Sequence, residues 1–350
     1  MTTADVIDPA AQSPVDEQNV LMVGLDTRTD PQGNPLPAEV LAQLHAGSTD
    51  DGGDSTDTMI VIHIPAGGGQ ATAISIPRDS YVQLAGGFGQ HKINSAFARG
   101  KLAAQQRLRG QGVADAMLET ESDRAGAKTT IATVEQLTGL TINHYAAVNL
   151  AGFSMISQAV GGVPVCLKAA VHDSYSGAEF PAGPQLVSGP QALAFVRQRH
   201  GLPHGDLDRI QRQQAFLASM ARVVLSGDTL TDSAKRNNLI AAIKKTTVLD
   251  RGWDIVSFAR QLQGMGAGDI HFSTIPVAAI SQPTPHDGDA VEVDPQQVQA
   301  FVQEQIGNMR YPDAVWPELS APAAFTLGGP PAPQAPVADP PGSGTGGCVN

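Results

Sequence analysis

Short runs of β-branched and apolar residues alternate along this chain with longer segments in which apolar residues recur at helical spacing. The β-like runs predict strands at about residues 19–25, 58–64, 71–76, 145–148, 163–167 and 270–275. The helical spacing predicts helices at about 129–137, 153–160, 208–225, 232–247, 253–263 and 295–306. The segment PAGGGQ between the second and third strands is typical of a hairpin turn. Strands with helices on both faces predict an α/β fold, a three-layer α-β-α sandwich with a mixed central sheet.

The same pattern divides the chain into three parts. Residues 1–18 are polar and contain proline, which predicts a flexible N-terminal linker. Residues 19–307 carry the predicted elements and form one domain, and residues 308–350 form a tail rich in Pro and Gly that we expect to be largely disordered. The sequence has no run of about 18 apolar residues and no signal-peptide pattern at its start, so no membrane-spanning segment is predicted.

Composition narrows the function. The 350 residues include 22 basic and 34 acidic side chains, for a formal net charge of −12, which argues against general nucleic-acid binding. Against this background, four arginines stand close together in VRQRHGLPHGDLDRIQRQQ: Arg197, Arg199, Arg209 and Arg212. A phosphate or carboxylate ligand would offset their mutual repulsion. The alternative is surface charge paired with Asp206 and Asp208.

The predicted local structure around these arginines favours an anionic ligand over surface ion pairs. Residues 193–200 read as a helix end that runs into a short strand, where alternation places Arg197 and Arg199 on one face and Gln198 and His200 on the other. Gly201, Pro203 and Gly205 then break the chain before the next helix, for which Asp206 or Asp208 is the candidate cap.

On that next helix, Arg209 and Arg212 are three residues apart and are therefore neighbours along one edge of the apolar stripe. Gln213 projects into the stripe itself. A half-buried glutamine needs hydrogen-bond partners, so Gln213 is either a ligand-binding residue or a satisfied core amide.

Acidic residues follow or precede two of the predicted strands. Asp26 follows the first strand in GLDTR, and Asp57 precedes the second in STDTM. If these strands are neighbours of opposite direction, both carboxylates meet at one edge of the sheet, which suits Mg²⁺. The alternative is that each aspartate caps a turn.

Two further motifs supply charge. IPRDSYV places Arg78 and Asp79 at the end of the third strand, where Arg78 could clamp a phosphate and Asp79 could orient it, or where the two could form a surface pair. HKINSAF places Lys92 and Asn94 at the start of a helical segment, which also favours anions. Acids for a metal, together with cations for phosphates, are the combination that phosphoryl transfer requires.

The two cysteines, Cys166 and Cys348, are read either as unrelated thiols or as a disulfide that pins the tail to the domain. We favour the disulfide, which would imply an oxidising compartment.

At this point the sequence resembles the LytR-CpsA-Psr family of bacterial cell-wall enzymes, and the actinobacterial members are the most similar in style. The resemblance rests on the ordered motifs NVLMVGLDTR, STDTM, ATAISIPRDSYV, HKINSAF, TVEQLTGLTINHYAAVNLAGFSMISQAVGGVPV and ALAFVRQRHGLPHGDLDRIQRQQ. It runs from about residue 19 to 225, and the helical region to about 307 is compatible with the same domain.

The resemblance implies a Mg²⁺-dependent phosphotransferase that moves a glycopolymer from a polyprenyl pyrophosphate carrier onto peptidoglycan, with arabinogalactan among the candidate wall polymers. Carried over motif by motif, it implies the following roles: catalytic for Arg78, Asp79, Arg197 and Arg199; substrate-binding for Arg28, Lys92, Arg209, Arg212 and Gln213; metal-binding for Asp26 and Asp57. Arg212 has no firm counterpart in the family and is equally a candidate structural partner of Asp206 or Asp208. For deprotonation of the acceptor, the candidates are the carboxylates Asp57 and Asp79 or the metal itself.

The resemblance further implies a monomer at the extracytoplasmic face of the bacterial membrane, held there by an N-terminal anchor that this chain lacks. Two departures reduce the positive charge of the pocket, because many family members carry basic residues where this chain has Ser55 and Val82. The loop at residues 29–54 is long and acidic, and we expect it to move over the site.

Two other functions stay open. A lipid pyrophosphate hydrolase would use water as acceptor, and a noncatalytic protein would sequester polyprenyl phosphates in an apolar groove. A transcription regulator fits poorly, since neither a helix-turn-helix pattern nor a basic face is visible.

Overall fold

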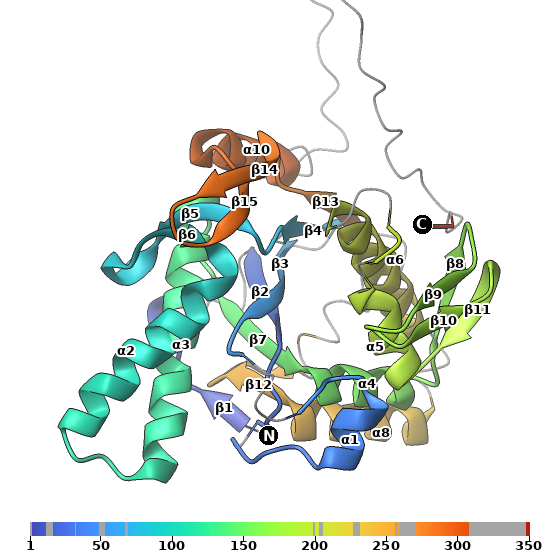
Figure 1. Ribbon diagram of the computed structural model, residues 1–350, viewed down its shortest axis with the longest axis horizontal. Helices are drawn as coiled ribbons and strands as arrows, with labels where there is room; N and C mark the ends of the chain where they lie inside the picture. The colour runs from blue at the N-terminus through green and yellow to red at the C-terminus, as the bar shows by residue number, and fades with distance from the viewer. Residues whose placement is uncertain are drawn as a thin grey trace, which may run out of the picture.

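The computed structural model describes residues 2–11, 17–31, 33–48, 53–66, 69–198, 200–202, 206–226, 232–255, 258, 270–307 and 348–350. Within these residues, the strands of the main sheet run side by side (Figure 1) in the order β1 (Thr2–Ala4), β12 (Thr247–Asp250), β7 (His144–Asn149), β2 (Gln18–Leu25), β3 (Thr56–Ile64), β4 (Ala71–Ile76) and β13 (Ile270–Thr274). β2 pairs parallel with β7 and antiparallel with β3, and β3 pairs antiparallel with β4. The sheet is therefore mixed, and the predicted hairpin is confirmed.

Helices cover both faces of this sheet (Figure 1). The described helices are α1 (Ala38–Gln43), α2 (Ala96–Gly110), α3 (Asp115–Thr138), α4 (Leu150–Ala159), α5 (Pro190–Arg197), α6 (Asp206–Leu225), α8 (Ser233–Thr246) and α10 (Pro295–Gly307). One core joins α2, α3 and α10 to one face of β2, β3 and β4, and a second core lies among α4, α5, α6 and α8. The predicted three-layer sandwich is confirmed.

Local chemistry explains where several helices begin and end. The side chain of Asn149 accepts a hydrogen bond from the amide of Gly152 (2.7 Å) and caps α4, and Asp232 caps α8 in the same way through the amides of Ala234 and Lys235. α3 ends at its C-terminus with Gly139, which adopts a left-handed φ of 73° and whose amide donates to the Glu135 carbonyl (2.8 Å).

Two glycines allow α2 and α3 to lie unusually close together. A Cβ atom at Gly100 would lie 2.3 Å from the hydroxyl oxygen of Thr129, and one at Gly126 would lie 2.7 Å from the carbonyl oxygen of Phe97. No larger side chain fits at either position without a shift of its neighbours, so these glycines set the spacing of the helix pair.

Small sheets extend the domain on two sides. β5 (Ser80–Leu84), β6 (Gly89–Lys92), β14 (Ala279–Thr284) and β15 (Gly288–Glu292) form one sheet; β8 (Val163–Leu167) pairs with β11 (Gly183–Val187), and β9 (Val171–Asp173) pairs with β10 (Ala178–Phe180). Single-turn helices occupy Pro9–Ala11, Ala85–Gly87 and Ile93–Ser95.

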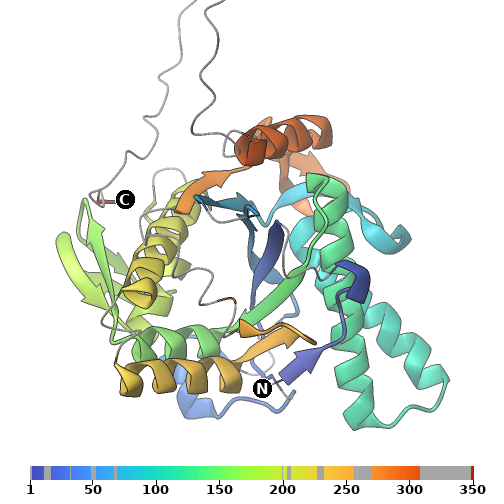
Figure 2. The same ribbon diagram turned by 180° about the vertical axis from the view of Figure 1, so that it is seen from behind.

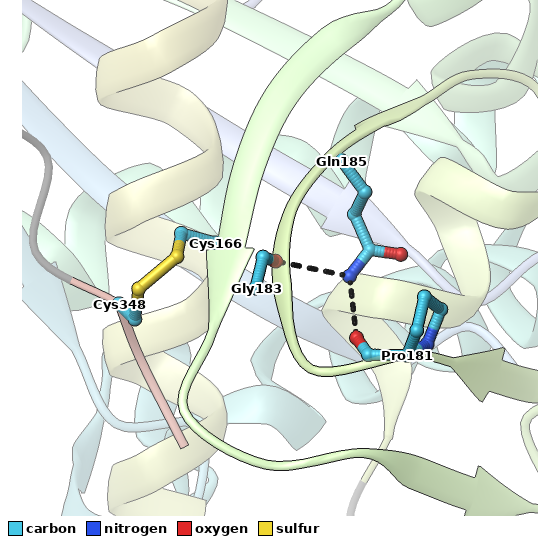
Figure 3. The surroundings of a disulfide bond; sticks show 5 residues. All are labelled: Cys166, Pro181, Gly183, Gln185 and Cys348. Atoms are coloured by element: carbon cyan, nitrogen blue, oxygen red, sulfur yellow. Dashed lines mark hydrogen bonds between the residues drawn. A yellow bond between two sulfur atoms is a disulfide. The ribbon is translucent and has the colours of Figure 1, made fainter.

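The disulfide that the sequence favours is present. Cys166 of β8 is bonded to Cys348 (Figure 3), although the two residues are separated by 182 positions. Val349 pairs in parallel beside Leu167 of β8, because the amide of Val349 donates to the Cys166 carbonyl (3.0 Å) and the amide of Lys168 donates to the Val349 carbonyl (2.8 Å). Residues 308–347 of the predicted tail lie outside the described residues.

The N-terminal residues differ from the linker that we expected. Thr2–Ala4 pairs parallel with β12, and Val6 and Ile7 are buried in the core beside α3. Figure 2 shows β1 beside β12 at this edge of the sheet. The largely polar composition of residues 1–18 did not indicate this strand pairing or the burial of Val6 and Ile7.

Other elements follow the predicted ranges with shifted ends. The helix expected at 129–137 is the second half of α3, and the helix expected at 253–263 lies mostly outside the described residues. The long loop at residues 29–54 contains α1 and a bridge between Thr29 and Pro35. Within the described part of the chain, no helix is long and apolar enough to cross a membrane.

Candidate functional site

A pocket lies between the main sheet and α4, α5 and α6. Its walls are apolar and come from both layers: Met22, Val23, Leu25, Ile60, Val148, Leu150, Phe153, Leu193, Val196 and Leu217. Its polar lining includes Asp26, Asp57, Asn149, Arg197, Arg209 and Gln213. The pocket therefore combines an apolar channel with a charged end, and several of the residues predicted from sequence lie there.

The two predicted metal ligands meet at this charged end. β2 and β3 are antiparallel neighbours, and Leu25 pairs with Thr56, so Asp26 leaves one strand where Asp57 lies on the other. Ser55 connects them, because its carbonyl accepts a hydrogen bond from the Asp26 amide (3.1 Å) and its hydroxyl donates to Asp57 Oδ1 (3.2 Å). The expected meeting of the two carboxylates is thus found in the structure.

Each of these carboxylates is paired with an arginine. Arg28 Nη1 lies 2.7 Å from Asp26 Oδ1, and Arg78 Nη1 lies 2.7 Å from Asp57 Oδ1. Asp79 lies between two cations, with Oδ2 at 3.7 Å from Arg78 Nε and Oδ1 at 3.5 Å from Lys92 Nζ. Arg78 and Asp79 therefore belong to one charge network with Asp57.

On the helical side of the pocket, Arg209 is buried and Arg197 is half-buried. Arg197 Nη1 donates to the carbonyls of Leu44 (3.2 Å) and His45 (3.3 Å), which fixes its guanidinium at the end of α5. Burial lowers the pKa of Arg197; Asp26 opposes this shift, Arg28 adds to it and Asp57 opposes it. An anionic ligand in the pocket would stabilise the charged form that burial disfavours.

Gln213 also lines the pocket, and its Nε2 donates to the carbonyl of Val196 (3.3 Å). The amide is thus partly satisfied by α5, while its position leaves it beside the charged end. Both alternatives from the sequence, ligand contact and satisfied core amide, describe part of this geometry.

Arg212 is not part of the pocket lining, and its contacts favour the structural alternative over the predicted role in substrate binding. Its side chain is fully buried, lies over the Phe195 ring at 5.3 Å, and donates to Gln198 Oε1 and to the main-chain oxygen of Asn350. Burial lowers the pKa of Arg212 to about 10, against the attraction of Asp208. Arg212 therefore joins α6 to the residues that follow the disulfide.

The predicted short strand after α5 is wrong for the described residues. Arg197 ends the helix, and Gln198 is buried, with its Nε2 on the carbonyl of His200 (3.0 Å). Gln198 is therefore occupied with Arg212 and with its own turn, and strand alternation does not describe this segment. Arg199 lies outside the described residues.

Sequence reasoning missed the groups that support the site. The carbonyls of residues 44–46 follow α1 and bind two arginines, since Ala46 accepts from Arg28 Nε (3.0 Å) in addition to the contacts of Arg197. Lys101 of α2 is 8% exposed, and its Nζ lies 3.1 Å from Asp54, 2.6 Å from Glu119 and 2.8 Å from Asp123. Because Asp54 precedes Ser55, Lys101 ties the segment that carries Asp57 to α2 and α3.

A larger hollow of about 500 Å³ lies elsewhere, between residues 6–11 and α3. Its charged lining residues are Asp8, Lys128 and Glu135, and Glu135 Oε1 already accepts from the amide of Ile142 (2.9 Å). None of the predicted site residues lines it, so volume alone does not identify the site.

The donor chemistry at Asp26 and Asp57 fits a hard cation, which takes one or two carboxylates and completes its shell with phosphate and water oxygens. Among the described residues, no group of three His, Cys, Asp or Glu side chains could hold a metal by itself. Among the described residues, the cations Arg28, Arg78, Lys92, Arg197 and Arg209 lie around the carboxylates Asp26, Asp57 and Asp79. Their guanidinium and ammonium groups supply hydrogen-bond donors that suit an anion.

Comparison with known proteins assigns the chain to a family. The model of the LytR_cpsA_psr family matches residues 3–310. The chain belongs to this family. It is 47% identical over 290 residues to the cell wall biosynthesis protein LcpA of Corynebacterium glutamicum, which covers 83% of this chain and 55% of LcpA. It is 31% identical over 308 residues to the probable cell wall biosynthesis protein LcpB of the same organism, covering 88% of this chain and 60% of LcpB.

The chain thus spans little more than half the length of these two LytR_cpsA_psr relatives. It is also 27% identical, over 257 residues, to the polyisoprenyl-teichoic acid–peptidoglycan teichoic acid transferase TagU of Enterococcus faecalis, covering 72% of this chain and 69% of TagU. Among solved structures, it is similar to TagV of B. subtilis, with a TM-score of 0.60, 21% identity and coverage of 84% and 99%. TagT bound to LIIa-WTA is similar with a TM-score of 0.57, 17% identity and coverage of 88% and 99%. These structures share the fold of the described domain.

Proposed function

We propose that this chain is a phosphotransferase domain that moves a glycopolymer from a polyprenyl pyrophosphate carrier onto peptidoglycan and forms a phosphodiester link. The observation that carries the proposal is the pocket, in which an apolar channel ends at a cluster of arginines and aspartates. A lipid pyrophosphate matches both parts of this pocket, because it has a long apolar chain and a compact anionic head. The name of the TagU relative, a polyisoprenyl-linked polymer transferase, supports the same class of donor.

The apolar walls suit the lipid. Phe153 and Leu217 come from the helical layer and Ile60 from the sheet, so the channel lies between the two layers of the domain. Burying a methylene group in such a channel contributes about 0.8 kcal/mol, which makes even a few isoprene units a substantial anchor. With the chain held there, the head group would lie beside Arg197, Arg209, Asp26 and Asp57.

In this proposal Arg197 and Arg209 bind the pyrophosphate oxygens from the helical side, and Arg78 binds them from the sheet side. Mg²⁺, held by Asp26 and Asp57, would supply charge neutralisation for the phosphate that leaves with the lipid. Asp79 holds Arg78 and Lys92 in position. Of the two candidate bases, Asp57 lines the pocket and Asp79 does not, but the oxygens of Asp57 would already be occupied by Arg78 and by Mg²⁺.

The ion pairs predict an order of binding. Without substrate, Arg28 and Arg78 occupy one oxygen of each carboxylate, and the neighbouring guanidinium groups disfavour a divalent cation. A pyrophosphate head that is esterified at both ends adds about two negative charges and supplies further oxygen ligands. We therefore expect Mg²⁺ to bind together with the lipid pyrophosphate and only weakly before it.

The cellular setting belongs to the same proposal. The relatives named above are cell wall biosynthesis proteins, and the disulfide is of the kind that persists in oxidising compartments. We place the reaction at the extracytoplasmic face of the membrane, where it would join a wall polymer such as arabinogalactan to peptidoglycan.

The direct test incubates the protein with a lipid-linked oligosaccharide and peptidoglycan fragments, with and without Mg²⁺, and detects the phosphodiester-linked product by mass spectrometry. We expect the product only with Mg²⁺, and a loss of at least about a hundredfold in Asp57→Asn and Arg197→Ala. Arg222→Ala is the matched control, because Arg222 is exposed near the end of α6 and lies outside the pocket lining.

Two results would contradict the proposal. Mg²⁺-dependent release of phosphate products without any transfer would favour a hydrolase with water as acceptor. Tight lipid binding without turnover, unchanged in Arg78→Ala, would favour a lipid-sequestering protein.

A further inference from the structure

An exposed aromatic side chain lies near the arginine segment. Tyr175 occupies the turn between β9 and β10 and is 76% exposed. Among the large hydrophobic side chains that are exposed in the described part of the chain, it is the aromatic one; the others are Leu102, Met117, Leu186 and Ile280. A single exposed apolar residue is ordinary on a protein surface. The surroundings of Tyr175 decide whether it differs from that background.

Tyr175 is held in place before any ligand arrives. Its amide donates to Asp173 Oδ1 (3.0 Å), and the hydroxyl of Ser176 donates to Asp173 Oδ2 (2.8 Å), so the buried Asp173 carboxylate organises the turn. The Tyr175 ring stacks on the His200 ring with a centroid distance of 4.3 Å and an angle of 28° between the planes. His200 Nδ1 lies 3.6 Å from Asp173 Oδ1. The same carboxylate therefore lies beside both halves of the aromatic pair.

Two observations place the Tyr175–His200 pair near the pocket. His200 is three residues beyond Arg197, so their Cα atoms lie within about 11 Å of each other. On the other side, Gly177 has a φ of 72°, and a Cβ atom there would lie 2.4 Å from His45 Cδ2. The carbonyl of His45 accepts a hydrogen bond from Arg197 Nη1 (3.3 Å). The turn that carries Tyr175 thus packs against the segment that fixes Arg197.

We propose that Tyr175 and His200 form a binding platform for a sugar ring of the glycan that enters or leaves the reaction. This proposal rests on the proposed function: with the lipid in the channel and the pyrophosphate among the arginines, the glycan has to leave the pocket across the surrounding surface. The C–H face of a pyranose ring packs well on an exposed aromatic face, and a preorganised ring binds without losing side-chain freedom.

The neighbouring side chains favour a sugar over another apolar ligand. His172 and Ser174 are exposed beside Tyr175, and His200 is itself 64% exposed, so donors and acceptors for hydroxyl groups surround the ring. No other large exposed hydrophobic side chain of the described residues belongs to this turn, which argues against a protein interface with an apolar centre. A glycan needs what this surface offers, one aromatic face and several polar groups.

The test measures binding and turnover with separate probes. A muropeptide disaccharide and a lipid-linked oligosaccharide are each titrated into the wild type, Tyr175→Ala and Tyr175→Trp. We expect Tyr175→Ala to weaken binding of at least one of these probes about tenfold and Tyr175→Trp to retain it. The probe that loses affinity tells whether the platform serves the acceptor or the donor. Ile280→Ala, which removes an exposed apolar side chain from β14, is the matched control.

Phosphate release from geranylgeranyl pyrophosphate, which carries no sugar, separates this proposal from the proposed function. We expect Tyr175→Ala to match the wild type in this assay within about twofold. If the wild type binds or cleaves the lipid pyrophosphate but Tyr175→Ala binds both glycan probes normally, the platform is wrong and the proposed function stands. If Tyr175→Ala also loses activity on the sugar-free lipid, the residue acts through the pocket and the platform is again wrong.

Discussion

Replacement of Lys101 by methionine tests how much the ion pairs of this residue stabilise the segment that carries the candidate metal ligand Asp57. The ammonium group is buried and lies within 3.1 Å of carboxylates from Asp54, Glu119 and Asp123. Burial alone would lower the pKa of Lys101, but Asp123, Glu119 and Asp54 together raise it above its ordinary value, so the group stays charged. The Lys101→Met variant keeps an unbranched side chain that is one heavy atom shorter and removes the charge.

The expected loss follows from the exposure of the partners. Removing one member of a fully buried ion pair costs about 3–5 kcal/mol, because the remaining charge is left without compensation. Here the carboxylates can be partly rehydrated, since Asp54, Glu119 and Asp123 are 32%, 37% and 43% exposed. We therefore expect the free energy of unfolding to fall by about 2–3 kcal/mol at pH 7.

The loss should depend on pH in a defined direction. Burial raises the pKa of Asp123 to about 6, while Lys101 acts to lower it; without Lys101 the pKa rises further. For an acid whose pKa is higher in the folded state than in the unfolded state, stability is greatest when the group is protonated and is lost as pH rises through the folded pKa. The deficit of Lys101→Met should therefore shrink between pH 7 and pH 5.

Urea unfolding of the wild type and the variant at pH 7 and pH 5 provides the measurement. Lys128→Met is the matched control, because Lys128 is exposed on α3. An equal deficit at both pH values, or a change at pH 7 no larger than that of the control, would refute the electrostatic account of this cluster.

Two further predictions concern packing and covalent closure. Gly126→Ala should lower the free energy of unfolding by about 1–3 kcal/mol, because its Cβ would lie 2.7 Å from the Phe97 carbonyl oxygen, whereas Gly110→Ala, with open space around it, should raise stability by up to about 1 kcal/mol. Equal thermal midpoints for these two variants would contradict the packing argument. Reduction of the disulfide, which spans 182 positions, should lower the free energy of unfolding by up to about 5 kcal/mol. Urea unfolding with and without reductant measures this loss, and a Cys348→Ser variant that still responds to reductant would show that the effect lies elsewhere.

The layers and the meeting of the two carboxylates could be predicted because both depend on local patterns. β-branched runs such as TMIVIHI define β3, and the antiparallel pairing of β2 with β3 follows from their succession and brings Asp26 beside Asp57. Residues at strand ends take their positions from the sheet, so a correct sheet order is enough to place them.

The different environments of Arg209 and Arg212 could not be predicted from local patterns. They are three residues apart on one helix, yet Arg209 lines the pocket and Arg212 binds Gln198 and Asn350. Asn350 is 138 positions away, and no local pattern indicates such a partner. Lys101 was missed for a related reason: a lysine on an amphipathic helix reads as solvent-exposed unless its distant partners are known.

The bond between Cys166 and Cys348 also has a topological consequence. It closes the intervening chain into a covalent ring that contains α5 and α6, with Arg197 and Arg209, while Asp26 and Asp57 lie outside the ring. A protease that cuts once anywhere between residues 167 and 347 therefore opens the ring without releasing a fragment. After a cut between residues 167 and 196, which lies before both arginines, the arginine half and the carboxylate half of the site would remain one molecule only through this bond, until a reductant separates them.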